Sequence, residues 1–258
     1  MGTKNTILSR IDLAIIEEIL AHCGSVTDSN CIYEALAKEY SKAEVKNKIN
    51  KLKKAGWLVR IKRGKYAVTN IESHNFANIS PLVLASIFVS DSYVSFELAL
   101  NHYGLFDQLS KRVISVTSKK PKKFTFQNTE YLFSKIKSEL YFGFKEVSID
   151  NQKASIAELE KVVLDYLYFR NDTYSIDLLL EKLTEGRSEL DFEKLQKYAL
   201  KYPVFVKRRL GFLLDLIDVN SDKLHQEVRK KSGYSKLTKN STKFNAKWRL
   251  YYEDRFTK

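Results

Sequence analysis

The amino-acid sequence predicts an α+β fold. In residues 5–55 apolar side chains recur at helical spacing, and a pattern of two short strands follows directly. Beyond residue 75, strand-like and helix-like segments are mixed along the chain. The chain has 258 residues, of which 44% are hydrophobic, so it is long enough for more than one core. We therefore expect an N-terminal domain, a mixed α/β domain after it, and a basic C-terminal extension.

Two amphipathic helices are expected first. Residues 5–22 carry an apolar stripe that ends before Gly24, a residue typical of helix C-termini. The stripe consists of Ile7, Leu8, Ile11, Ala14, Ile15, Ile19 and Leu20. Residues 29–38 supply a partner for this stripe, because Ile32, Ala35 and Leu36 share one helix face.

A third helix is expected from Ser41 to Gly56. Ser41 and Glu44 have the spacing of a capping box, in which each side chain satisfies a free backbone donor of the first turn. Strand patterns then flank the turn at Arg63-Gly64, which predicts a hairpin. Three helices followed by a hairpin within residues 1–75 is the element order of a winged helix-turn-helix.

Residues 76–221 are expected to form the mixed α/β domain. Its expected helices span 95–102, 155–169, 176–183, 191–202 and 206–219, and its expected strands span 113–118 and 123–126, with a strand pair in 141–149. Residues 222–258 are rich in lysine with scattered aromatic side chains. This segment is expected either to contact RNA or DNA through charge and stacking or to be a solvated extension.

The net charge is unevenly distributed. The chain has a formal net charge of +13, which favours polyanionic partners. Residues 1–75 hold 13 Lys and Arg against 8 Asp and Glu, and residues 222–258 hold 11 against 4. Residues 76–221 hold 20 against 19, so the positive charge is concentrated at the two ends of the sequence.

The third helix and the hairpin are the candidate DNA-binding surface. Residues 42–65 contain ten Lys and Arg and one acidic residue, Glu44. Val45, Ile49 and Leu52 fall on one stripe that must face the first two helices, so the opposite side of the helix is exposed. The expected DNA-binding residues are Lys42, Lys46, Asn47, Asn50, Lys51, Lys54, Arg60, Lys62, Arg63 and Lys65.

The chemistry of these side chains suits double-stranded DNA. A helix fits the major groove, where asparagine can pair with adenine and lysine can reach guanine. Ala43, near the start of the helix, permits close approach, and Arg63 at the hairpin turn suits the narrow minor groove or its phosphates. A merely solvated lysine face and a protein–protein module are the alternatives.

No sequence pattern indicates an enzyme, a cofactor or a metal site. The four histidines, His22, His74, His102 and His225, are dispersed, and the nine glycines form no nucleotide-binding motif. Cys23 and Cys31, the two cysteines, support neither a disulfide scaffold nor a zinc site. Glu158, Lys161 and Asp165 share one helix face, and we interpret them as an exposed ion-pair row; a DNA-acting nuclease built on them is the enzyme alternative.

The N-terminal residues carry no apolar signal core, and the longest apolar stretch, residues 81–89, is far too short to span a membrane. We therefore expect a cytoplasmic protein without a membrane partner.

Several short motifs in their order resemble the AbiEi antitoxins, which are also described as predicted transcriptional regulators of viral defence systems. The similarity covers roughly residues 5–217. The motifs are Arg63-Gly64-Lys65-Tyr66, residues 93–100 leading to Tyr103-Gly104-Leu105, Val116-Thr117, residues 155–161 with Leu164-Asp165, and residues 209–214. One departure is Leu159, where the family commonly has a proline before the Glu-Lys pair.

The resemblance implies a bacterial antitoxin and autorepressor. Its N-terminal domain would bind inverted repeats in its own promoter, and its C-terminal domain would counteract a nucleotidyltransferase-like toxin encoded beside it, without a stable complex between the two proteins. A stand-alone transcription factor whose second domain binds a ligand or mediates assembly is the other interpretation.

Overall fold

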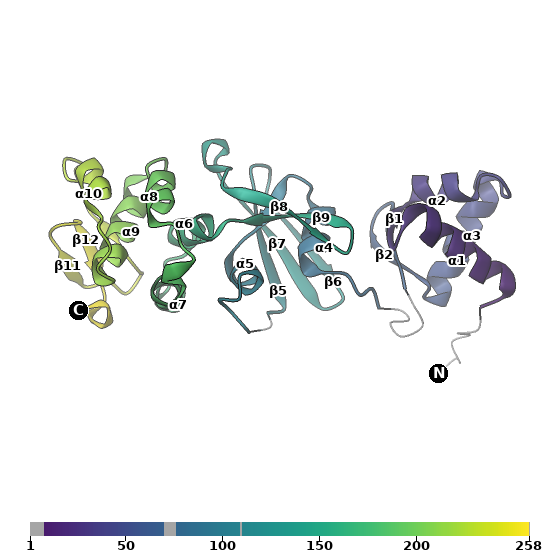
Figure 1. Cartoon of the computed structure of the whole chain (residues 1–258), viewed down its shortest axis with the longest axis horizontal. Helices are drawn as coiled ribbons and strands as arrows, with labels where there is room; N and C mark the ends of the chain where they lie inside the picture. The colour runs from purple at the N-terminus through teal and green to yellow at the C-terminus, as the bar shows by residue number, and fades with distance from the viewer. Residues whose placement is uncertain (1–7, 70–75, 109, 258) are drawn as a thin grey trace. The chain divides into compact units, whose positions relative to one another are not determined.

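The computed structural model of the chain divides into two compact units, Met1–Leu84 and Ala85–Lys258. It describes residues 8–69, 76–108 and 110–257. Both units combine helices with β-sheet, which confirms the α+β class (Figure 1). The expected domain boundary at residue 75 lies outside the described residues, and the units divide at Leu84.

The first unit consists of three helices and a three-stranded sheet. Its elements are α1 (Arg10–Cys23), β1 (Val26–Asp28), α2 (Ser29–Leu36), α3 (Lys42–Ala55), β2 (Leu58–Lys62) and β3 (Lys65–Val68). The strand order is β1-β3-β2 with both pairings antiparallel, so the first strand joins the outer edge of the hairpin.

Local side-chain caps determine where these helices begin and end. Ser9 and Asp28 accept hydrogen bonds from the first turns of α1 and α2. The expected capping box of Ser41 and Glu44 is confirmed at the start of α3. Gly56 ends α3 with a φ of 85°, a left-handed conformation that favours glycine.

The core of the first unit corrects the apolar stripe expected for α1. The buried residues of α1 are Asp12, Ile15, Ile16 and Ile19, whereas Ile11 and Leu20 are exposed. The helix is rotated relative to the expectation, so that Ile16 is buried and Asp12 lies on the inward face, where it pairs with Lys51 of α3. The faces expected for α2 and α3 are confirmed, since Ile32, Ala35, Leu36, Val45, Ile49 and Leu52 are all buried.

The second unit contains a six-stranded mixed sheet in the order β6-β7-β5-β4-β9-β8. Its strands are β4 (Ser92–Val94), β5 (Arg112–Thr117), β6 (Lys122–Phe126), β7 (Thr129–Lys135), β8 (Phe144–Ile149) and β9 (Gln152–Ala157). The two outer hairpins turn at Gln127-Asn128 and Asp150-Asn151, where every residue has a positive φ. Consecutive positive φ values are typical of tight two-residue hairpins.

Two strand assignments from the sequence are wrong. The segment 141–149 is not a strand pair, because β8 starts at Phe144 and pairs with β9. Residues 155–157, expected in a helix, belong to β9, which lies inside the sheet between β4 and β8. Ser155, Ile156 and Ala157 continue directly into the apolar pattern of α6, so periodicity over so short a stretch does not separate the end of the strand from the start of the helix.

Helices flank the sheet of this unit, and those that follow β9 gather at one end of it (Figure 1). They are α4 (Pro81–Phe88), which the division between the units crosses, α5 (Phe96–His102), α6 (Leu159–Phe169), α7 (Thr173–Glu185), α8 (Phe192–Ala199), α9 (Val204–Leu216) and α10 (Asp222–Val228), with short 3₁₀ turns at Ser138–Leu140, Gly186–Ser188 and Asp254–Phe256. Helix α6 is buried on all sides from Leu159 to Leu167.

A buried ion pair occupies the middle of α6. Lys161 and Asp165 have no exposed side-chain surface and pair with each other one helical turn apart. Lys161 also donates to the Tyr202 hydroxyl at 2.6 Å, and Ser95 donates to Asp165 at 2.9 Å. The exposed ion-pair row expected from the sequence is therefore wrong for these two residues, because the sheet and the α8–α9 connection enclose this face of the helix.

Residues 222–257 are folded onto the second unit, in contrast to the expected extension. They form α10 and a small sheet of β10 (Ser235–Lys236), β12 (Leu250–Tyr252) and β11 (Lys243–Asn245) in that order. Trp248 is completely buried and donates from its indole to Asp215 of α9 at 2.7 Å. Its ring packs on Gly211, where an added Cβ would lie 2.0 Å from a ring carbon. This aromatic anchor supplies the apolar burial that orders the lysine-rich segment.

Replacing Asp165 by Asn should lower the free energy of unfolding by about 3–5 kcal/mol, because it leaves the buried Lys161 ammonium without a counter-charge. Glu158→Gln is the matched control. The Glu158 side chain is 26% exposed and pairs with Lys194 at 3.3 Å, so its loss should change stability by less than about 1 kcal/mol. Urea unfolding of both variants measures the difference, and equal small losses would contradict the buried pair.

Candidate nucleic-acid interface

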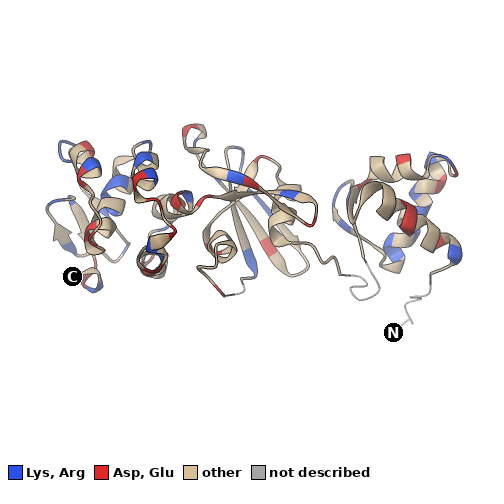
Figure 2. Cartoon of the chain, viewed as in Figure 1, with Lys and Arg blue, Asp and Glu red and all other residues tan. Residues whose placement is uncertain are grey.

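The outward face of α3 carries a row of polar and cationic side chains. Burial of Val45, Ile49 and Leu52 directs the opposite side of the helix to solvent. Asn47, Asn50 and Lys54 lie along the middle of that side, and the row also includes Ala43, with Lys42 and Lys46 flanking it. All of these residues are exposed. Figure 2 marks the cations of this region.

Most of these side chains have no partner within the protein. In the part of the chain that the structure describes, no hydrogen bond or ion pair involves the side chains of Lys42, Lys46, Asn47, Asn50, Lys54 or Arg63. The acidic residue nearest in sequence, Glu44, accepts from the backbone and hydroxyl of Ser41, and these hydrogen bonds lower the pKa of its carboxyl. Glu44 therefore caps the helix and forms no ion pair with Lys42, Lys46 or Lys54.

The hairpin adds a second group of cations. Arg63 is exposed at the turn, beside Gly64 with a φ of 77°. Arg60 is exposed on β2, and its Nε donates to the Lys62 carbonyl at 3.4 Å across a register shift between these residues. The backbone amide of Ser29 donates to the Gly64 carbonyl at 2.9 Å, so the hairpin turn is attached to the start of α2.

Two of the expected DNA-binding lysines are already paired. Lys51 lies 2.7 Å from Asp12 of α1, and Lys65 lies 2.9 Å from Asp28 before α2. Burial alone would raise the pKa of Asp12, but hydrogen bonds from Lys51 and Ser9 hold it below its ordinary value. The Cys31 amide and the Lys65 ammonium lower the pKa of Asp28. Lys51 and Lys65 thus hold the helices and the hairpin together, a role that sequence position alone does not indicate.

An open groove lies between α2 and α3, on the side where α3 begins. It is lined by Asn30, Tyr33, Glu34, Lys42, Ala43 and Lys46. The two lysines stand on its α3 side, and the small Ala43 leaves room between them. Lys42 and Lys46 give this edge of α3 the positive charge that the phosphates of a DNA backbone bind.

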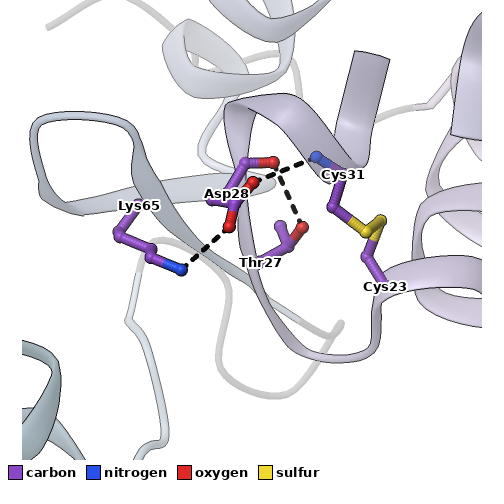
Figure 3. Close-up of a disulfide and its surroundings, with 5 residues drawn as sticks. All are labelled: Cys23, Thr27, Asp28, Cys31 and Lys65. Carbon is purple, nitrogen blue, oxygen red and sulfur yellow. Dashed lines mark hydrogen bonds and ion pairs between the residues drawn. A yellow bond between two sulfur atoms is a disulfide. The ribbon is translucent and has the colours of Figure 1, made fainter. Parts of the chain in front are cut away.

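A disulfide joins Cys23 at the end of α1 to Cys31 in the first turn of α2 (Figure 3). The sequence-based expectation of two unlinked cysteines is wrong here, because the short β1 turn brings the two Cα atoms to 6.0 Å, within disulfide range. Asp28 lies next to it, accepting from the Cys31 amide at 3.0 Å and from Lys65. The disulfide, the cap of α2 and the hairpin thus meet at one place.

The proposed catalytic set of the enzyme alternative is closed to substrate. Lys161 and Asp165 have no solvent-accessible side-chain surface. Burial lowers the pKa of Lys161 and raises that of Asp165, against their mutual attraction. Glu158 is not part of this pair and instead accepts from the Tyr198 hydroxyl at 2.9 Å. The three residues therefore do not form one accessible site.

Within residues 8–69, 76–108 and 110–257, no cluster of three or more His, Cys, Asp or Glu side chains has an arrangement suited to a metal ion. In the same ranges, none of the helices combines the length and the apolar character that crossing a bilayer requires.

Comparison with known proteins identifies a related fold. No protein-family model matches the chain, and no curated protein matches it. The crystal structure of the RV2827C protein from Mycobacterium tuberculosis is similar, with a TM-score of 0.68 and 12% sequence identity, over 97% of this chain and 94% of that one. At this identity the likeness concerns the fold alone.

Replacing Cys31 by Ser should destabilise the first unit by about 2–3 kcal/mol, because the open chain gains conformational freedom in the unfolded state. Reduction of the unaltered protein should have the same effect. Hydrogen exchange of α1 and α2 reports the change locally, and the Cys23→Ser/Cys31→Ser variant is the control that must not respond to reductant. Unchanged protection after reduction would show that the disulfide is not a stabilising link.

Proposed function

We propose that residues 8–69 are a winged helix-turn-helix that binds double-stranded DNA, and that the protein regulates transcription of its own gene. The observation that carries the proposal is the outward face of α3, where unpaired cations and two asparagines lie together beside a basic hairpin. In this arrangement α3 is the recognition helix, α2 is the helix before it, and β2 and β3 are the wing.

Each group on this surface has a role in DNA binding. Asn47 and Asn50 are in position to read base edges in the major groove, where an asparagine pairs with adenine through two hydrogen bonds. Lys46 and Lys54 reach phosphates or guanine edges on either side of them, and Arg63 extends from the wing to the minor groove or its phosphates. Lys51 and Lys65 contribute indirectly, because they hold α3 and the wing through Asp12 and Asp28.

The pairing pattern favours DNA over a solvated lysine face. A solvated face needs no particular order of residues, whereas here Lys51 and Lys65 are paired and, in the described residues, Lys46 and Lys54 form no ion pair. The row also contains two asparagines and a small residue, a composition suited to base contact. A protein–protein module, the competing hypothesis in the experiment below, would require a partner protein with an acidic surface.

Replacing Lys54 by Gln should weaken binding to all DNA sequences and lower the slope of log affinity against log salt concentration by about one. Replacing Asn50 by Ala should instead relax discrimination at one base pair by about 1–3 kcal/mol. Both are measured by fluorescence anisotropy with duplex DNA from the region upstream of the gene, in competition with random duplex, with and without reductant.

Lys51→Gln is the matched control for Lys54→Gln, since it removes one charge from the same helix at a lysine that Asp12 already neutralises. It should leave the salt slope nearly unchanged. Equal slopes for the Lys51 and Lys54 variants, or an affinity that does not depend on salt, would contradict DNA binding by this face.

The resemblance to the AbiEi antitoxins supplies the proposed setting: a cytoplasmic bacterial antitoxin that represses its own promoter at inverted repeats and neutralises a nucleotidyltransferase-like toxin encoded next to it. The motifs of that resemblance beyond residue 85 belong to the second unit, apart from the surface proposed for DNA. Repression and neutralisation are therefore proposed to be separable functions.

The full-length variant Lys46→Gln/Lys54→Gln/Arg63→Gln should lose repression and still protect cells from the neighbouring gene product. Repression is measured with a reporter fused to the promoter, and protection by counting survivors after the two genes are expressed together. Death of cells that contain well-folded variant would place neutralisation in the first unit. Survival without the antitoxin gene would show that the neighbour is not a toxin.

A further inference from the structure

The small C-terminal sheet exposes three aromatic rings side by side. Tyr234 is 66% and Phe244 is 50% exposed, and Tyr251 lies half-buried between them. The centroid of the Tyr251 ring is 5.2 Å from that of Tyr234 and 5.0 Å from that of Phe244. We call these three residues the aromatic face. Large exposed apolar groups gathered in this way mark binding surfaces more often than scattered ones do.

Strand register explains why the rings share one side. Phe244 of β11 is directly opposite Tyr251 of β12, and Lys236 of β10 is paired with Tyr251 from the other edge. Side chains of paired residues point to the same face of a sheet. Tyr234 directly precedes β10, and its ring contacts that of Tyr251 on this face. Leu250 and Tyr252, the neighbours of Tyr251, face the opposite way, where Tyr252 packs on Phe212 of α9.

The aromatic face has a rigid support. Two consecutive buried arginines of α9 donate to the backbone of this segment, one before the sheet and one within it. Arg208 donates to the Lys231 carbonyl at 2.9 Å, and Arg209 donates to the Lys236 carbonyl at 2.7 Å. Burial lowers the pKa of Arg209 to about 10. A surface held in this way loses little conformational freedom when a ligand binds.

The segment that carries the rings is rich in exposed cations, and Lys236 lies on the same side of the sheet as Tyr251. Lys243 and Lys247 are paired with Asp254 and Asp215. Arg255 is paired with Asp177. In the described residues, no acidic side chain pairs with Arg229, Lys230, Lys231, Lys236, Lys239 or Arg249, which are also exposed. Figure 2 marks the cations of the C-terminal segment. The surface thus offers stacking groups and uncompensated positive charge together.

We propose that the aromatic face binds single-stranded nucleic acid, with unpaired bases on Tyr234, Tyr251 and Phe244 and phosphates on the surrounding cations. Aromatic rings on a small sheet beside a basic path are suited to this ligand, because every base has a flat face and the backbone carries one negative charge per nucleotide. Paired bases do not expose their faces, so duplex DNA is excluded as the ligand of this surface. A second copy of the chain is disfavoured, since it would bring like charges together.

The proposal concerns a surface in the second unit and does not depend on the function proposed for α3. It is tested in the full-length Lys46→Gln/Lys54→Gln/Arg63→Gln variant, so that oligonucleotide binding by the first unit does not contribute. Fluorescein-labelled oligo(dT) and oligo(rU) of about 12 nucleotides are titrated at several salt concentrations, with a duplex of the same length for comparison. Stronger binding of one oligomer than of the other identifies DNA or RNA as the natural source.

In that variant, Tyr234→Ala and Phe244→Ala should each weaken binding of both single strands at least about fivefold. Lys236→Gln should lower the salt slope by about 0.7, the value for one phosphate of a single strand. The matched controls are Tyr174→Ala and Lys120→Gln, which remove an exposed tyrosine on α7 and an exposed lysine after β5; neither should change the affinity.

Two further substitutions at Phe244 test whether the aromatic ring itself binds the bases. Phe244→Leu retains an apolar side chain without a ring and should lose binding as Phe244→Ala does, whereas Phe244→Trp should bind and show fluorescence quenching as bases stack on the indole. Equal binding by the Leu variant, no binding of either oligomer, or equal effects of Tyr174→Ala and Tyr234→Ala would overturn the proposal. So would a dimer in sedimentation that Phe244→Ala dissociates, because the face would then join two copies.

Discussion

The second unit depends on the buried ion pair between Lys161 and Asp165. Charges removed from water are tolerated only when they are paired and fully hydrogen-bonded. Here Ser95 and Tyr93 come from the sheet side and Tyr202 from the α8–α9 connection. Each contact requires its element to be in place, so the pair couples the sheet, α6 and the helices after it. This explains why a helix with charged residues on its inner face is buried on all sides.

The same requirement orders the C-terminal segment. Arg208 and Arg209 are buried without an acidic partner and donate to backbone carbonyls and a serine hydroxyl. These carbonyls belong to α6, to the turn after α10 and to the small sheet, so the two arginines determine the path of a chain that is otherwise rich in repelling lysines. Trp248 adds the apolar contact on Gly211. The aromatic face is rigid because its backbone, and not its side chains, is held.

In the first unit, pairing separates two kinds of lysine that look alike in the sequence. Lys51 and Lys65 are structural, since Asp12 and Asp28 hold them at the junctions between α1, α2, α3 and the hairpin. Lys46 and Lys54 lie on the outermost part of α3 and have no such neighbour. A surface that binds a polyanion needs paired lysines as well as unpaired ones, because the paired lysines keep the unpaired lysines in a fixed geometry.

The sequence by itself determined the features that depend on near neighbours. Interactions over a few residues account for the Ser41–Glu44 cap, the end of α3 at Gly56, the Arg63-Gly64 hairpin and the inward face of Val45, Ile49 and Leu52. It also placed the cationic row of α3 on the outside. Only the tertiary structure decided the inward turn of Asp12, the link between Cys23 and Cys31, the interior strand β9 and the burial of Lys161 with Asp165. The lysine-rich C-terminus was ordered by the tertiary structure as well. In each of these cases the deciding partner is brought close only by a turn of the chain or by contacts between separate elements, and local periodicity carries no information about it.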